Sequence, residues 1–133
     1  DATVVRIQGD GPLFFVVSID RNPIPIVIDA PTTGEPLTGL AWYRRQEIGT
    51  DNYKFPAVSG TQLPLNVPTV VSCLIQDRHV SLLINKKPIF DWEYDEQRFP
   101  MHRMFDRREH ETLHFGCYDA EIHINALTTQ QIR

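Results

Sequence analysis

Residues 69 to 92 read TVVSCLIQDRHVSLLINKKPIFDW, and this stretch decides the fold class. Apolar residues alternate with polar ones on both sides of a short polar break, residues 76–79. Alternation with a period of two around such a break predicts two antiparallel strands joined as a β-hairpin. If residues 77 and 78 form a two-residue loop, the inward face is wholly apolar, so the register is self-consistent. The predicted inward pairs are Ile75 with Val80, Cys73 with Leu82 and Val71 with Ile84.

A second polar turn follows this hairpin. Residues 85–88 read NKKP, and residues 89–92 then continue as another short segment ending in a tryptophan. Because Pro88 stands where a strand begins, it removes no hydrogen bond from the centre of a ladder. The stretch therefore predicts three short antiparallel strands in succession.

The rest of the chain has the same character. The run from Leu13 to Ile19 is almost continuously apolar, as in a strand covered on both faces. Pro25 indicates an edge strand or a strand start, and a weak helical pattern covers residues 101–108. Short strands between Gly, Pro, Asp and Asn turns predict an all-β, antiparallel β-sandwich or barrel with at most one short helix. The other predicted strands are residues 3–8, 24–29, 39–45, 113–118 and 121–127.

Length and charge narrow the classes of function. A chain of 133 residues predicts one domain, residues 1–133, that is large enough to bury its own core. The net charge of −4 predicts no broad basic surface for nucleic acid, and no apolar run is long enough for a transmembrane segment. The chain begins at Asp1 without a signal-like segment, so we interpret it as a domain excised from a larger protein or as a mature fragment.

The two cysteines, Cys73 and Cys117, both fall on predicted inward strand faces. Two buried free thiols are the favoured interpretation, because unpaired cysteine packs as a small apolar residue. A disulfide between adjacent sheets is the alternative, and it would imply an oxidising compartment. The sequence contains no CxxC motif of the kind that binds metals and no GxSxG motif that would mark a nucleophilic serine. It also lacks a glycine-rich loop for the phosphates of a cofactor.

A family resemblance adds to this pattern. The run from His79 to Trp92 resembles the strand, Lys-Pro turn, strand and Asp-Trp order of concanavalin A-like jelly-roll domains. Residues 113–116 and 122–124 resemble the closing hairpin of the same group, which includes laminin-G-like and 3-keto-disaccharide hydrolase-like domains. The resemblance covers residues 63–127. It implies a jelly-roll sandwich of two antiparallel sheets, one of them concave, and usually a carbohydrate or protein ligand.

The chain departs from this family where catalysis is concerned. The glycosidases of the fold carry an alternating acidic strand of the type ExDxE, whereas this chain has Glu93, Asp95 and then Gln97. The galectin set of sugar-binding residues is also missing at recognisable spacing. Glu93 and Asp95 could still supply a general acid and base for glycoside hydrolysis. The favoured interpretation is a solvated turn after Trp92.

Aromatic and polar residues gather in two neighbouring segments. Trp42-Tyr43-Arg44 is followed by Asn52 and Tyr53. Flat aromatic rings stack on sugar rings, while arginine and asparagine bond hydroxyls, so these residues form the best predicted carbohydrate site. Alternatively Trp42 belongs to the core, or the mixture of aromatic residues and arginine marks a protein interface.

Two histidines give the sharpest geometric prediction. If residues 118–119 form a two-residue loop, Phe115 pairs with Ile122, and His114 lies directly opposite His123 on the other face. Two imidazoles so placed could contact a ligand, or share a metal if Glu121 or His79 supplied a third ligand. The alternative is a pair of plain exposed histidines.

These patterns favour a non-catalytic ligand-binding module, with carbohydrate as the first ligand class and no cofactor. The resemblance suggests an accessory domain of a larger extracytoplasmic protein. The two rivals are an enzyme domain of the keto-glycoside hydrolase type and a structural protein-interaction domain. In the last case the charged segment 98–111, which includes four apolar residues, would dock a neighbouring protein domain.

Overall fold

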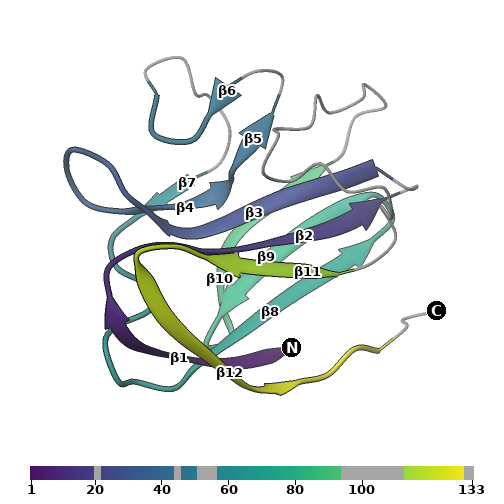
Figure 1. Ribbon diagram of the computed structural model, residues 1–133. Coiled ribbons are helices and arrows are strands. Elements are labelled where there is room, and N and C mark those ends of the chain that lie inside the picture. The colour runs from purple at the N-terminus through teal and green to yellow at the C-terminus, as the bar shows by residue number, and fades with distance from the viewer. Residues whose placement is uncertain (20–21, 44–45, 51–56, 94–112, 131–133) are drawn as a thin grey trace.

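The computed structural model describes residues 1–19, 22–43, 46–50, 57–93 and 113–130, which form two packed antiparallel sheets (Figure 1). The β1 sheet has the strand order β10 (Lys87–Glu93), β9 (His79–Ile84), β8 (Thr69–Gln76), β1 (Ala2–Gly9) and β12 (Ala120–Leu127). The β2 sheet has the order β11 (His114–Cys117), β2 (Leu13–Ile19), β3 (Asn22–Ala30), β4 (Leu37–Leu40) and β7 (Ala57–Ser59). A separate two-stranded ribbon contains β5 (Trp42–Tyr43) and β6 (Gln46–Glu47).

The prediction of an all-β antiparallel sandwich is therefore confirmed. The described residues contain no helix, and consequently none that could cross a membrane. The helix predicted for residues 101–108 lies outside the described residues.

The hairpin that decided the fold class has the predicted register. Val71 pairs with Ile84, Cys73 with Leu82 and Ile75 with Val80. Residues 77, 78, 85 and 86 have φ between 49° and 67°, as expected in the two-residue turns that match the twist of flanking strands. The second turn is shorter than the four residues predicted, because Lys87 already pairs with Ile84.

The main core lies between the two sheets. Ile24, Ile26 and Ile28 of β3 are fully buried there, opposite Val80 and Leu82 of β9. A second, smaller cluster covers the outer face of the β2 sheet. It is formed by Val16, Val27, Ala30 and Ala41, with Phe14 and Ile48 packed against them. The two clusters confirm that β2 is covered on both faces.

The expectation of an edge position for Pro25 is wrong, since β3 is the central strand of its sheet. The Ala41 amide donates to the Pro25 carbonyl at 2.9 Å, but Pro25 has no N–H to complete the pair. The Ala41 carbonyl instead accepts from the Ile48 amide at 3.1 Å. The proline thus ends the β3–β4 ladder where the β5–β6 ribbon leaves the sheet.

The predicted hairpin between the last two strands is also wrong. β11 pairs with β2, whereas β12 pairs with β1 in the other sheet. The connection from β11 to β12 crosses between sheets beside the connection from β1 to β2, and the Gly11 amide donates to the Asp119 carbonyl at 3.2 Å. A Cβ on Gly11 would lie 1.7 Å from the Tyr118 carbonyl oxygen, and one on Gly9 would lie 2.2 Å from that of Asp119. Only glycine permits this close approach of the two crossovers.

Candidate functional site

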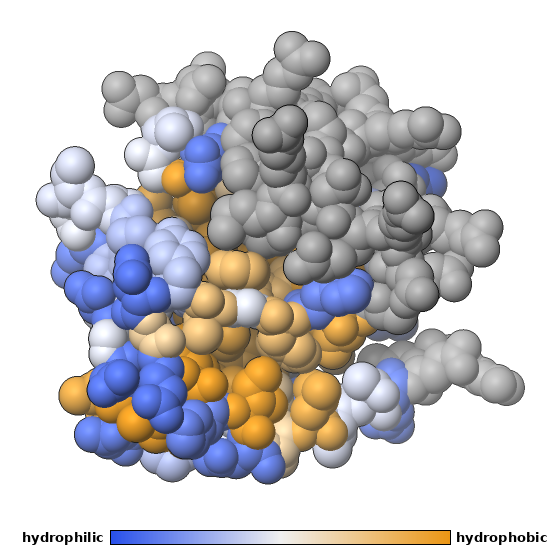
Figure 2. Space-filling model, in the orientation of Figure 1, coloured by the Kyte–Doolittle hydropathy of each residue, from blue (hydrophilic) through white to orange (hydrophobic). Residues whose placement is uncertain are grey.

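A cavity of about 340 Å³ lies between the two sheets on the side of the sandwich formed by β11 and β12. The β2 sheet contributes Phe15, Val17 and Phe115 to its wall, and the β1 sheet contributes Ala2, Val71 and Cys73. Figure 2 shows apolar surface gathered on this side of the molecule. The volume of this cavity lies within the range of about 300–1,000 Å³ that is typical of small-molecule sites.

Exposed aliphatic side chains surround the mouth of this inter-sheet cavity. Leu74, Ile75, Leu113 and Leu127 all contact it, and each is between 38% and 48% exposed. They are half of the eight large apolar residues that are exposed in the described part of the chain. A concentration of this kind marks an interaction site more often than chance exposure.

The Cys73 thiol faces the inter-sheet cavity in its neutral form. Burial raises the pKa of this thiol to about 12, so it is a weak nucleophile at neutral pH. Cys73 and Cys117 are both free, as the favoured interpretation predicted, and no disulfide joins them. The prediction that Cys117 is buried is wrong, because it ends β11 at the crossover and is exposed there.

The predicted carbohydrate site falls partly on the β5–β6 ribbon. Trp42 pairs with Glu47 and Tyr43 with Gln46, so each aromatic residue lies across from a residue with a carboxylate or an amide. The other three predicted residues, Arg44, Asn52 and Tyr53, lie outside the described residues. The site as a whole remains a prediction.

The two histidines predicted to face each other are on different sheets. His114 pairs with Val16 on β2, and His123 pairs with Val5 on β1. Their predicted pairing is wrong because the turn between them crosses the sandwich. The His123 Nε2 lies 2.7 Å from a Glu121 oxygen. The described residues contain no group of three potential ligands that could hold a metal ion.

A polar network on the outer face of the β1 sheet was not foreseen. The Ser81 hydroxyl donates to Asp91 Oδ1 at 3.0 Å, and the His79 Nδ1 lies 3.2 Å from the same oxygen. The hydrogen bond from Ser81, and then that with His79, lowers the pKa of the Asp91 carboxyl. Because the hydroxyl bonds to the carboxylate and not to the imidazole, the histidine is not placed to activate it.

The carboxylates considered for hydrolysis are not brought to the cavity. Glu93 is exposed at the end of β10, where it pairs with His79, and Asp95 lies outside the described residues. The pairing of Ser81 with Asp91 could not be predicted from the sequence. It depends on an irregularity between Pro88 and Phe90, which shifts the register of β10 against β9.

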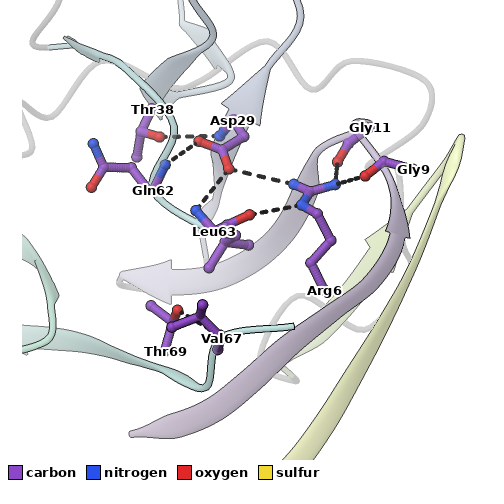
Figure 3. Close-up of polar contacts among 9 residues, drawn as sticks. All are labelled: Arg6, Gly9, Gly11, Asp29, Thr38, Gln62, Leu63, Val67 and Thr69. Carbon is purple, nitrogen blue, oxygen red and sulfur yellow. Dashed lines mark hydrogen bonds and ion pairs between the residues drawn. The ribbon is translucent and has the colours of Figure 1, made fainter. Parts of the chain in front are cut away.

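A buried ion pair lies near the crossovers (Figure 3). Arg6 on β1 is 4% exposed and Asp29 on β3 is 2% exposed, with 3.4 Å between Nη2 and Oδ2. The Arg6 guanidinium also donates to three carbonyl oxygens, those of Leu63, Gly9 and Gly11. Sequence reasoning missed this pair, although the alternation of β1 places residue 6 on the same inward face as Ala2 and Val4.

The Asp29 carboxylate is equally well bonded. It accepts from the amides of Gln62 at 2.7 Å and Leu63 at 2.9 Å, while the Asp29 amide donates to the Thr38 hydroxyl. A second cleft of about 350 Å³ borders this pair. Since the carboxylate and guanidinium bond to protein groups, we interpret this network as structural.

No protein-family model matches this sequence, and neither the curated proteins nor the solved structures include a significant match. The resemblance to concanavalin A-like domains therefore remains a prediction.

Proposed function

We propose that this chain is a non-catalytic binding module that takes a small apolar ligand between its two sheets. One observation carries the proposal, namely the inter-sheet cavity with its ring of exposed aliphatic side chains. A ligand that covered these side chains would remove apolar surface from water, which contributes about 25 cal/mol per Å² buried.

The chemistry of the cavity wall supports binding without catalysis. Apart from Asp1 and the Cys73 thiol, the described lining residues have no side chain that ionises. The thiol is held neutral by burial. General acid–base catalysis is most often performed by histidine, glutamate, aspartate or lysine, and Asp1 is the one such residue among the described lining residues.

Toluene binding provides the first test. We expect toluene to shift the amide NMR signals of Val17, Val71 and Phe115 and to slow the labelling of Cys73 by N-ethylmaleimide. Cys117, which does not line the cavity, should label at an unchanged rate. Absence of both the signal shifts and the protection at saturating toluene would refute the proposal.

A filling variant gives a second, independent test. Cys73→Phe places a ring in the cavity and should weaken toluene binding at least about tenfold, which corresponds to about 1.4 kcal/mol. Cys117→Phe adds the same ring at an exposed position and should leave binding unchanged. Equal affinity for toluene in the two variants would contradict the assignment of the site.

Carbohydrate binding on the β5–β6 ribbon is the second candidate, within an accessory module of a larger extracytoplasmic protein. The backbone register favours it, because it brings an aromatic and an acidic residue, Trp42 and Glu47, to paired positions of the ribbon. A glycan array with the wild type and Trp42→Ala tests this candidate. Sugar binding that Trp42→Ala abolishes would support it, and no binding to any glycan at millimolar concentration would exclude it.

A further inference from the structure

We infer that the ligand of the inter-sheet cavity is a linear-chain amphiphile with an uncharged head group. This inference rests on the proposed function and names its ligand class. Three features carry it: the size of the cavity, the polar segment at its rim and the lack of a net positive charge among the described lining residues.

The cavity is too large for a single small ring. Its volume of about 340 Å³ is more than twice the roughly 150 Å³ of an engineered apolar cavity that holds one benzene. Aliphatic and aromatic groups from both sheets form the inner wall, where Phe15 and Phe115 have ring centroids 5.8 Å apart. A flexible chain of methylene groups can fill such a space between two sheets.

The polar part of the lining lies in one segment. Thr128, Thr129 and Gln130 follow directly after β12 and contact the cavity beside Leu127. The Thr128 amide donates to the Asp1 carbonyl at 2.8 Å, which holds this segment against the start of β1. Hydroxyl and amide side chains can both donate to and accept from a hydroxyl or ester head group.

The charge of the head group follows from what the lining lacks. Among the described lining residues there is no lysine, arginine or histidine side chain to pair with a carboxylate, sulfate or phosphate. The terminal ammonium of Asp1 is the one cation among the described lining residues, and it already donates to the Thr128 carbonyl at 2.9 Å. The Asp1 carboxylate balances this charge, so these residues offer no net positive charge to an anion. An unpaired charge against an apolar cavity is costly, so an uncharged head group is favoured.

A chain-length series tests the inference. Affinity should rise by about fourfold for each methylene from 1-hexanol through 1-octanol to 1-decanol while the chain still lies within the cavity. Decanoate and decyltrimethylammonium have comparable chains with charged heads and should bind at least about tenfold more weakly than 1-decanol. Isothermal titration calorimetry on the wild-type chain measures all five.

Two leucine variants test whether the alkyl chain of the ligand lies in this cavity. Leu127→Ser removes an aliphatic group that contacts the cavity and should weaken 1-decanol binding several-fold. Leu65→Ser removes a similarly exposed leucine that does not line the cavity and should leave binding unchanged.

The outcomes separate this inference from the proposed function. Alcohols that bind without a chain-length dependence, or decanoate that binds as tightly as 1-decanol, would overturn the inference. If toluene still bound, the proposed function would stand. Failure of toluene and of every alcohol to bind would overturn both.

Discussion

Breaking the buried ion pair should destabilise the sandwich strongly. Asp29→Asn removes the charge that Arg6 faces and replaces one oxygen, which accepts backbone amides, with an NH₂ group that cannot accept. Removing one partner of a buried pair costs about 3–5 kcal/mol. For 133 residues, an unfolding entropy of roughly 2.1 cal/mol/K per residue gives about 0.28 kcal/mol/K, so the melting temperature should fall by about 11–18 °C.

The matched control is Asp119→Asn. Asp119 has a φ of 52° and Asp29 a φ of 61°, so both carboxylates sit on a left-handed backbone, but Asp119 is exposed at the crossover. A surface substitution of this kind should stay within about 0.5 kcal/mol of the wild type. Circular dichroism melts of the two variants at pH 7 measure the difference.

A double-mutant cycle isolates the contribution of the pair itself. Arg6→Met leaves three carbonyl oxygens, two of them in buried hydrogen bonds, without their guanidinium donor, so it should also cost about 3–5 kcal/mol. Because each single variant already removes the contact of 3.4 Å, the double variant with Asp29→Asn should cost less than the sum of the two. Asp29→Asn melting within 2–3 °C (about 0.6–0.8 kcal/mol at that entropy) of Asp119→Asn would refute the assignment of a structural role.

Three further variants test the crossover, a turn and the outer polar network. Gly11→Ala should lower the melting temperature or prevent folding, whereas Gly34→Ala, whose Cβ would meet nothing within 4 Å, should be nearly neutral; equal melts would refute the close approach of the crossovers. Lys86→Gly should stabilise the chain by up to about 1 kcal/mol in urea unfolding, since glycine adopts the φ of 66° without strain, and a loss of stability would contradict that reasoning. Ser81→Ala should raise the pKa of Asp91 toward 3.8 in a carbon NMR titration, and an unchanged pKa would show that the hydroxyl does not matter. Because the folded pKa is lowered, this carboxylate stabilises the fold above pH 3.8 and loses that effect as the pH falls through the folded pKa. In Ser81→Ala the stabilisation should be smaller, and its loss should be complete at a higher pH.

The alternation of apolar and polar residues correctly predicted that β8 pairs with β9 within one sheet. It did not predict where the polypeptide crosses from one sheet to the other. The hairpin around Asp77 and Arg78 has both loop residues at positive φ, which suits two strands of one sheet. At the last connection only Asp119 has a positive φ, although the apolar alternation on each side looks the same. The crossover depends on Gly9 and Gly11, more than 100 residues away in the chain, and period-two patterns hold no information about such a partner.

The candidate site escaped sequence reasoning for a related reason. Val71 and Cys73 were correctly predicted to face inward. That the two sheets leave a space beside these residues depends on side chains from β1, β2, β8 and β11 together. Trp42 and His114 were predicted as site residues because aromatic and imidazole side chains can be recognised from the residue type alone. A cavity lined by ordinary aliphatic residues leaves no such pattern in the sequence.

The arrangement of the two ends of β1 links stability to the proposed site. Ala2 lines the inter-sheet cavity and Arg6 forms the buried ion pair, four residues or about 13 Å along the same strand. At the Arg6 end, the hydrogen bonds of two crossovers and the ion pair join both sheets. The Ala2 end can therefore keep aliphatic side chains exposed without loss of the fold. Effects of variants at the two ends should be independent at this separation, so Asp29→Asn should lower the melting temperature while the folded protein keeps its affinity for toluene.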